Sequence, residues 1–598
     1  MEPHRCWIAK SDSERRFVKS LRAATILVAL LAAACNRPSW REAVPDGWPY
    51  ALDSAPVSAT KGMVVSTSRY ASDVGAAVLA AGGNAIDAAV ATAFVLAVVN
   101  PEAGNIGGGG FMIVRLADGT TAALDFRERA PGAASRDMYL DEAGELTDGS
   151  VVGHRAVGVP GSVAGLWEVH RRYGRAEWGD LLAPAIRSAE GFVVTDRLAR
   201  SLRHYSGDLT QFPYTSAIFL RDGAAPDVGD TLVQSDLART LQRIQEHGRD
   251  GFYAGETARL IIDEMRRGGG IISAQDLASY QPSWRQPIEF TYRGYSIVSM
   301  PPSSSGGITL ALMARILEGY ELSRLPWHSP QMIHLLAEAW KRAYADRNEY
   351  LGDPDFVSIP TTRLISAAYG MERRAGISLE RATPSGDVLP GLGPYQPEGN
   401  TTHLSVVDSA GNAVSLTTTI NSFYGIKAVV GGAGFFLNNE MDDFAARPST
   451  PNMFGLVQGE ANAIAPGKRM LSAMTPTMVL RPDRSLFLVL GSPGGATIIT
   501  NVFQNIMNVV DYGMNILEAV HAPRLHHQHL PDRIDYELDA LDDATIAVLE
   551  AMGHSVNELH DPESLYPYIG DVQAIMVLPD GMFQGVSDPR RGGAAVGF

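Results

Sequence analysis

A threonine at the junction of a loop and a strand is the residue whose setting best suits nucleophilic chemistry. Residues 382–399 are rich in proline and glycine, which predicts an exposed, flexible loop. The loop leads into Asn400-Thr401, and residues 402–408 alternate between polar and apolar types as a β-strand does. A threonine hydroxyl is a weak nucleophile, but a free α-amino group on the same residue, with a pKa of about 8, can act as its base. Only cleavage before Thr401 creates that amine.

The sequence after Thr401 predicts a β-hairpin that brings a second hydroxyl beside the first. The alternating runs 402–408 and 412–420 flank a turn at Ser409-Ala410-Gly411. If the turn centres on Ala410, Thr401 lies opposite Thr419 to within about one or two residues. On spacing alone, the interpretation of both threonines as ordinary strand residues is favoured.

Helices and further hairpins must position this junction. We expect helices over 72–81 and 85–99, the second apolar on nearly every side and therefore buried. Residues 155–380 have mainly helical patterns, including a helix that begins after Ser329. Other hairpins are predicted at 111–116 with 121–126, 475–480 with 486–490, and 574–578 with 582–585. Hairpins with helices on either side predict a layered α+β sandwich and not a βαβ fold.

Composition excludes several functional classes. The chain has 598 residues, 45% of them hydrophobic and 19% charged, as in an ordinary globular protein. A net charge of −16 without a basic stripe argues against a nucleic-acid partner. The two cysteines, Cys6 and Cys35, lie near the N-terminus, so the body of the protein has no disulfide, Cys-ligated metal site or cysteine nucleophile.

The first 35 residues have the pattern of an export signal. Several basic residues precede an apolar run, Ala23–Ala34, that is too short to span a bilayer. The run ends at Cys35 in a sequence similar to a bacterial lipoprotein cleavage box, although the leucine lies one place too far from the cysteine. Plain secretion to the periplasm or medium and lipidation at Cys35 both remain open, and a cytoplasmic N-terminal helix is disfavoured.

Several motifs, in order, resemble the γ-glutamyltransferase family. The stretch Asn400–Asp408 is similar to the family's processing site, and the resemblance covers about residues 60–598. The other matching segments are Gly104–Phe111, Asp125–Glu128, Leu437–Phe444, Gly491–Gly495 and Ser587–Arg590.

The resemblance implies a fold and a self-processing mechanism. The family has the N-terminal-nucleophile hydrolase fold, an αββα sandwich of two stacked antiparallel sheets between helical layers. By this analogy, Thr401 attacks the carbonyl of Asn400 and divides the precursor into a large subunit, 36–400, and a small catalytic subunit, 401–598, which remain one intertwined heterodimer. Thr401 then accepts the γ-glutamyl group of glutathione as an ester and passes it to water or to the amine of an amino acid or peptide. No cofactor is implied.

The resemblance also assigns site residues. A γ-glutamyl group carries an α-carboxylate and an α-ammonium, so its pocket needs a cation and anions in fixed places. The implied catalytic residues are Thr401, the supporting hydroxyl of Thr419, and the N–H groups of Gly494 and Gly495 as an oxyanion hole. The implied substrate-binding residues are Arg127 and Ser472 for the carboxylate and Asn421, Glu440 and Asp443 for the ammonium.

Two positions depart from the expected bacterial pattern, and one cluster suggests a metal. Ala473 replaces the second serine of the carboxylate-binding pair. Phe454 stands where a tyrosine often gates the lid, 448–459, so we expect a less firmly latched lid.

A histidine cluster beside Asp532 could bind zinc, but adjacent strand residues face opposite ways, so structural packing is favoured. Its members are His521, His526, His527 and His529.

Two alternative functions remain. The first is an acylase of the same architecture that hydrolyses glutaryl or cephalosporin-type amides, which lack the α-ammonium. Glu440 and Asp443 argue against it, whereas Ala473 and Phe454 keep it open. The second is a non-catalytic homologue with a decayed site, against which the intact Thr401 argues.

Overall fold

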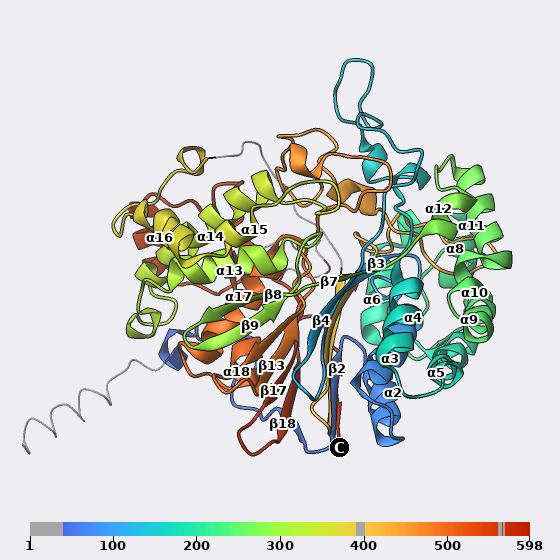
Figure 1. Ribbon diagram of the computed structural model, residues 1–598, viewed down its shortest axis with the longest axis horizontal. Coiled ribbons are helices and arrows are strands. Elements are labelled where there is room, and N and C mark those ends of the chain that lie inside the picture. Colours follow the sequence, from blue (N-terminus) through green and yellow to red (C-terminus); the bar gives the residue numbers. More distant parts are fainter. Residues whose placement is uncertain (1–39, 390–400, 560–564, 566–567) are drawn as a thin grey trace, which may run out of the picture.

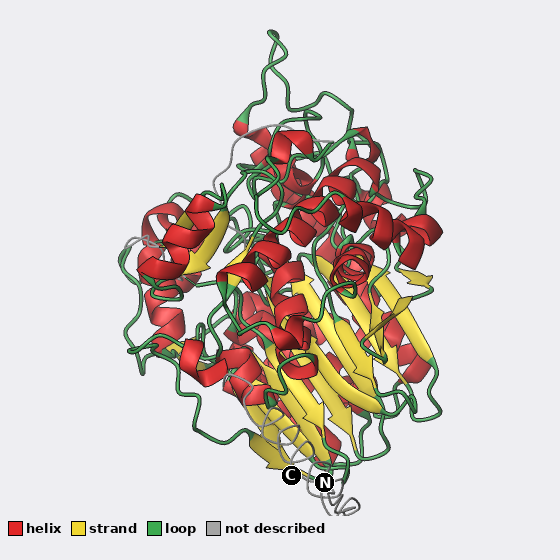
Figure 2. Cartoon of the chain, turned by 90° about the vertical axis from the view of Figure 1, so that its left-hand side faces the viewer, coloured by secondary structure: helices red, strands yellow, loops and turns green. Residues whose placement is uncertain are grey.

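Two stacked antiparallel sheets form the centre of the molecule, and helices cover both outer faces (Figures 1 and 2). The computed structural model describes residues 40–389, 401–559, 565 and 568–598. This arrangement confirms the predicted α+β sandwich. The proposed signal segment 1–35, Cys35, most of the loop 382–399 and Asn400 lie outside the described residues.

The first sheet has seven strands and contains the predicted hairpin at its centre. Thr401 pairs with Thr419 in the β10–β11 ladder, which confirms the register expected from the turn. The predicted hairpin after residue 110 is also present, as β3 and β4. In order, the strands are β19 (Ala594–Gly597), β2 (Gly62–Ser66), β10 (Thr401–Asp408), β11 (Ala413–Thr419), β3 (Gly109–Arg115), β4 (Thr121–Phe126) and β7 (Ser283–Arg285).

The second sheet also has seven strands, and the two remaining predicted hairpins are in it. They are β12 with β13 and β17 with β18. The strands β7, β8 and β9 lie in the region that was expected to be mainly helical, and the sequence analysis missed them. In order, the strands are β1 (Val57–Ala59), β18 (Phe583–Ser587), β17 (Gln573–Val577), β13 (Leu486–Gly491), β12 (Thr477–Leu480), β9 (Tyr295–Ser299) and β8 (Ile288–Tyr292). Both sheets therefore combine strands from before and after residue 400.

Alternation along the strands divides the interior into two large cores. Met63 and Val65 on β2 face the core between the sheets, whereas Val64 faces the helices on the other side. One outer layer includes α2 (Arg69–Ala80), α3 (Ala85–Val99), α4 (Ser162–Tyr173) and α5 (Trp178–Glu190). The other includes α13 (Gly306–Leu317), α14 (Pro330–Tyr350), α17 (Thr497–Val510) and α18 (Ile516–His521).

Local signals fix the ends of two of these helices. Asn84 caps α3 in a reciprocal capping box with Asp87, and every residue of α3 is buried, as predicted. Ser329 caps α14 by accepting a hydrogen bond from the Met332 N–H. Ser329, followed by Pro330, identified the start of α14 in the sequence. The helix α3 was predicted from its apolar run, and its capping box was recognised only in the structure.

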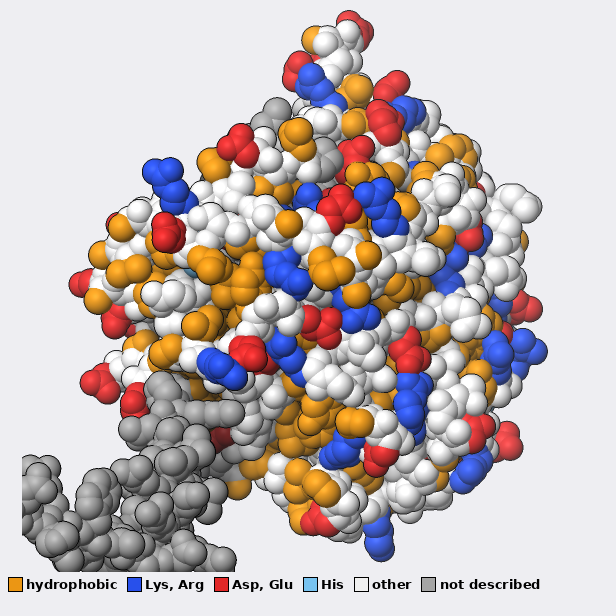
Figure 3. All heavy atoms as spheres, turned by 60° about the vertical axis from the view of Figure 1, so that its left-hand side comes forward, with side chains coloured by type: hydrophobic (Ala, Val, Ile, Leu, Met, Phe, Trp, Pro, Cys, Tyr) orange, Lys and Arg blue, Asp and Glu red, His pale blue; other side chains and the backbone are white. Residues whose placement is uncertain are grey.

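The surface carries charges of both signs. On the face shown in Figure 3, acidic and basic side chains are interspersed. Within the described ranges, no helix combines the length and the apolar character needed to cross a bilayer.

Candidate active site

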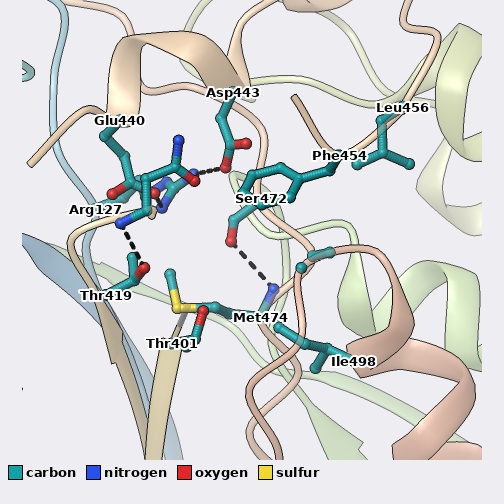
Figure 4. A pocket seen from close by; sticks show the side chains of 13 residues that line it. Arg127, Thr401, Thr419, Glu440, Asp443, Phe454, Leu456, Ser472, Met474 and Ile498 are labelled. Carbon is teal, nitrogen blue, oxygen red and sulfur yellow. Dashed lines mark hydrogen bonds and ion pairs between the residues drawn. The ribbon is translucent and has the colours of Figure 1, made fainter. Parts of the chain in front are cut away.

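Strand ends from distant parts of the chain meet at one edge of the first sheet. Thr401 is the first residue of β10, Thr419 is the last of β11, and Arg127 follows the last residue of β4. Because neighbouring strands are antiparallel, the start of one and the end of the next share an edge. One cavity there is lined by Arg127, Thr401, Thr419, Asn421, Glu440, Asp443, Phe454, Leu456, Ser472, Ala473, Met474, Gly495 and Ile498 (Figure 4). The structure thus brings together all the predicted site residues within the described ranges except Gly494, which lies next to the lining residue Gly495.

The two threonines occupy the floor of the cavity. Thr401 is 6% exposed and Thr419 is 2% exposed. The Thr419 hydroxyl oxygen accepts a hydrogen bond from the Asn421 N–H at 2.8 Å, and Figure 4 shows the Met474 side chain beside Thr401. Asn421 has a φ of 72°, a left-handed conformation that asparagine tolerates better than most residues. The turn after β11 therefore fixes the orientation of the second hydroxyl.

Charged side chains gather at one end of the cavity. The Arg127 guanidinium is fully buried and forms ion pairs with Glu440 and Asp443. A third carboxylate, Glu128, lies 3.7 Å from Arg127 Nη1 and is also fully buried. Three carboxyl groups therefore surround one guanidinium, which leaves an excess of negative charge when all are ionised.

Burial changes the protonation of these acids. Desolvation raises the pKa of Glu128 to about 7, even though the nearby Arg127 opposes the shift. The pKa of Glu440 is raised well above its usual value, and that of Asp443 is raised too, again by burial against the attraction of Arg127. This end of the cavity therefore holds protons near neutral pH and can gain negative charge to balance a bound cation.

A serine beside Arg127 offers a hydrogen-bond donor. The Ser472 hydroxyl oxygen accepts from the Met474 N–H at 3.1 Å, so its own proton can be donated into the cavity. The Ser472 backbone is held by a hydrogen bond that its N–H donates to the Ser303 carbonyl at 2.9 Å. The next residue, Ala473, lines the cavity without any polar atom on its side chain.

A glycine loop faces Thr401 from the second sheet. Gly494 and Gly495 connect β13 to α17 and have φ values of +132° and +54°, which side-chain-bearing residues rarely adopt. Their N–H groups donate no hydrogen bond to another described residue. A Cβ atom at Gly495 would lie 2.9 Å from the Phe454 ring. The loop is held from behind by the Tyr344 hydroxyl, which donates to the Ala496 carbonyl. The paired N–H groups, next to a helix N-terminus, suit a developing oxyanion.

The segment 448–459 covers the cavity and is tied to the same acidic region. The Met453 N–H donates to Asp442 Oδ2 at 2.9 Å, and Asn452 Nδ2 lies 3.3 Å from Asp443 Oδ1. The Phe454 carbonyl accepts from Gln528 Nε2 at 3.1 Å. This bond uses the backbone, so it does not require a hydroxyl at position 454. Whether the lid is less firmly latched than one with a tyrosine stays a prediction.

Comparison with known proteins now decides the family. Residues 71–598 match the family described as Gamma-glutamyltranspeptidase. The chain belongs to this family. It is 47% identical over 539 residues to the "Glutathione hydrolase proenzyme" of Escherichia coli K12, covering 90% of this chain and 91% of the relative.

Acylases are also similar to this chain. The "Acylase ACY 1 proenzyme" of Pseudomonas sp. SE83 is 40% identical over 561 residues, covering 92% of this chain and 96% of the relative. The crystal structure of the cephalosporin acylase from Bacillus halodurans superposes with a TM-score of 0.81 at 29% identity, covering 93% of this chain and 99% of that one. The γ-glutamyltranspeptidase fold is therefore confirmed, and the substrate must be decided by the pocket.

The four histidines of the possible zinc site each contact a different part of the protein. His521 Nδ1 lies 2.6 Å from the Ala51 carbonyl. His526 contacts Thr500 and Gln528, and His529 Nε2 is within 3.0 Å of the carbonyls of Ser385 and Val388. His527 Nε2 lies 3.4 Å from Asp532. The rings of this cluster are thus engaged in packing, as the strand geometry favoured.

Sequence reasoning missed several residues around the cavity of this γ-glutamyltranspeptidase. Leu456, Met474 and Ile498 form much of its apolar wall. They were missed because apolar residues carry no signal that separates a pocket wall from a core. Glu128 could have been found, since it directly follows Arg127 in the sequence.

Proposed function

We propose that the protein is a self-processing γ-glutamyltransferase that cleaves γ-glutamyl amides such as glutathione, with Thr401 as the nucleophile. The observation that carries the proposal is one cavity lined by Thr401, by a buried arginine–carboxylate cluster and by Gly495. The family match and the glutathione hydrolase relatives support the same reaction.

The first step is cleavage of the precursor. The Thr401 hydroxyl attacks the carbonyl carbon of Asn400, the peptide C–N bond breaks, and the acyl group moves to oxygen as an ester. Water then hydrolyses the ester, which gives a carboxylate on Asn400 and a free α-amine on Thr401. The large subunit, 36–400, and the small subunit, 401–598, stay together because both sheets contain strands of each.

The second step is acyl transfer. The α-amine of Thr401 takes the hydroxyl proton as the oxygen attacks the γ-carbonyl, and the Thr419 hydroxyl supports the nucleophile. The N–H groups of Gly494 and Gly495 stabilise the oxyanion. The amine of the donor leaves with a proton, and water or an acceptor amine resolves the γ-glutamyl ester.

The charged end of the cavity selects the acyl group. The donor carboxylate is held by Arg127 and the Ser472 hydroxyl, while its ammonium is held by Glu440, Asp443 and the Asn421 side chain. The excess of acids over Arg127 supports this assignment, because an ammonium compensates it. A glutaryl group offers no such cation, so the acids would stay uncompensated.

Two assays test the proposal. Purified protein should show two chains on a denaturing gel in place of one of 64.2 kDa, with a new N-terminus at Thr401 by mass spectrometry. It should release nitroaniline faster from γ-glutamyl-p-nitroanilide than from glutaryl-p-nitroanilide.

The second candidate function is a glutaryl-type acylase, which the apolar Ala473 and Phe454 and the acylase relatives favour. Faster release from the glutaryl anilide would establish it. A protein that stays whole and inactive would instead be a non-catalytic homologue.

We also propose that the protein is exported, with residues 1–35 as the signal. The proposal is supported by the basic residues and the apolar run before Cys35. Mass spectrometry of the mature N-terminus tests it and separates lipidation at Cys35 from plain secretion to the periplasm or medium. An intact Met1 in the mature protein would contradict export.

A further inference from the structure

A buried arginine lies behind the cavity and has no part in the mechanism above. Arg347, in the last turn of α14, is 1% exposed. Its hydrogen bonds go to uncharged oxygens: Nε donates to Ser305 Oγ at 3.1 Å, and Nη1 donates to Asn348 Oδ1 at 3.0 Å and Gln458 Oε1 at 3.3 Å. Nη2 has no hydrogen-bond partner among the described residues. Attraction to the Asp443 carboxylate offsets only part of the cost of burying this cation, because all its hydrogen bonds go to neutral groups. Its contacts therefore call for an explanation beyond packing.

One contact of Arg347 leads to the carboxylate-binding end of the pocket. Ser305, whose hydroxyl oxygen accepts from Arg347, donates to the Ser472 carbonyl from both its hydroxyl, at 2.6 Å, and its N–H, at 2.7 Å. Ser472 is the residue whose hydroxyl faces the cavity. The guanidinium therefore orients the hydroxyl that holds the backbone of Ser472.

The other contact leads to the ammonium-binding end. Gln458, which accepts from Arg347 with its side-chain oxygen, donates from its side-chain nitrogen to the Asp443 carbonyl at 3.0 Å. Asn462 Nδ2 reinforces this link with bonds to the same Asp443 carbonyl at 2.6 Å and to Gln458 Oε1 at 2.8 Å. Ser472 and Asp443 thus lie on separate segments. Both segments are connected through hydrogen bonds to the rigid, planar guanidinium of Arg347.

We propose that Arg347 is a positioning residue that sets the spacing between the two ends of the donor pocket and so selects acyl groups with both an α-carboxylate and an α-ammonium. The inference rests on the proposed γ-glutamyl activity and adds a determinant of its specificity. Arg347 does not line the cavity, so it acts through Ser472 and Asp443. Binding of a γ-glutamyl donor uses both ends of the pocket, so it depends on the distance between them. A glutaryl donor binds only at the carboxylate end, so a change in that distance affects its binding less.

The test compares two anilides that differ only in the α-ammonium. In Arg347→Lys and Arg347→Gln, we expect the ratio of kcat/KM for γ-glutamyl-p-nitroanilide to that for glutaryl-p-nitroanilide to fall about tenfold, chiefly through the KM of the γ-glutamyl donor. Lysine keeps the positive charge but lacks the planar guanidinium that bonds Ser305 and Gln458 at once. The ratio should therefore fall in both variants.

The matched control is Arg342→Lys, on the same helix and also buried. Its side chain contacts Glu338, Gly376 and Thr383, none of which lines the cavity, so its ratio should not change. If glutaryl turnover is too slow to measure, the ratio of the inhibition constants of glutarate and L-glutamate as competitive inhibitors replaces the kcat/KM ratio.

Each outcome decides the inference. Equal losses for both donors, or an unchanged ratio in the Arg347 variants, overturn it. If those variants fail to fold or cleave, Ser305→Ala is the second test. It removes the hydroxyl that joins Arg347 to the Ser472 carbonyl and keeps both the Ser305 N–H bond to that carbonyl and the Gln458 link. This variant must lower the ratio, and an unchanged ratio overturns the inference as well. A wild-type protein that prefers the glutaryl donor contradicts the proposed function itself, which is a different result.

Discussion

The nucleophile and the donor pocket are built in contrasting ways. Thr401 and Thr419 belong to one hairpin, and its register alone places them opposite each other. The pocket takes Arg127 from the end of β4, Asp443 from a short 3₁₀ helix and Ser472 from the loop before β12. The reactive pair therefore depends on local pairing, whereas substrate recognition depends on segments brought together by the whole fold.

Perturbations of the hairpin and of the donor pocket should therefore have separable effects. A change within the hairpin should affect precursor cleavage and turnover together, because both reactions use Thr401. A change among the pocket side chains should affect only the donor, because cleavage of the precursor needs no α-carboxylate or α-ammonium.

Replacing the nucleophile should abolish both reactions. We expect Thr401→Ala to leave a single uncut chain and to reduce nitroaniline release to background. Thr401→Ser, which keeps a hydroxyl, is the control and should still give two chains. Two chains from Thr401→Ala on a denaturing gel would show that another residue is the nucleophile.

Removing the guanidinium should separate the two reactions. Arg127→Gln leaves Glu440 and Asp443 buried without their cation and takes away the carboxylate ligand. We expect kcat/KM for γ-glutamyl-p-nitroanilide to fall roughly 100- to 1,000-fold, while the gel still shows two chains. An uncut precursor in this variant would mean that cleavage also depends on the pocket, and the contrast between the two regions would fail.

Restoring a hydroxyl at position 473 should strengthen donor binding. Ala473 lines the cavity beside Ser472, so Ala473→Ser adds one hydrogen-bond donor near the carboxylate. One such bond contributes about 1 kcal/mol, so the KM of the γ-glutamyl donor should fall about fivefold. The glutaryl donor has the same carboxylate, and its KM should fall by a similar factor. An unchanged KM for both would place the carboxylate elsewhere.

The pH dependence of donor selection should reflect Glu128. Burial raises its pKa to about 7, so it is protonated below that pH and ionised above it. As the pH rises from 6 to 8, the acidic cluster gains negative charge, and we expect the preference for γ-glutamyl over glutaryl donors to increase about threefold. In Glu128→Gln this increase should be smaller, because only Glu440 and Asp443, whose pKa values burial also raises, remain to titrate in the cluster. Taking the ratio cancels titration of the Thr401 amine, which affects both donors alike.

Much of the fold followed from patterns that are local in the sequence. Helix α3, the hairpins β3–β4, β12–β13 and β17–β18, and the register of β10–β11 were all predicted, because apolar runs, turns and alternation act over a few residues. The hairpin β8–β9 was missed because it lies within a region whose pattern is mainly helical. Its turn at Arg293-Gly294 is also a local signal, and only the pairing of β9 with β12 depends on a distant part of the chain.

From the residues alone, Thr401 could be placed opposite a second hydroxyl, and the resemblance then supplied the proposed nucleophile and the proposed donor-binding residues. The enclosure of Arg127 by three carboxyl groups, and the position of Arg347 near them, could be seen only in the folded molecule. Hydrogen-bond ladders and caps act between near neighbours, so they can be read along the chain. The protonation and selectivity of a buried charge cluster depend on which distant groups share its low-dielectric space, and that is set when the two sheets and their helices pack.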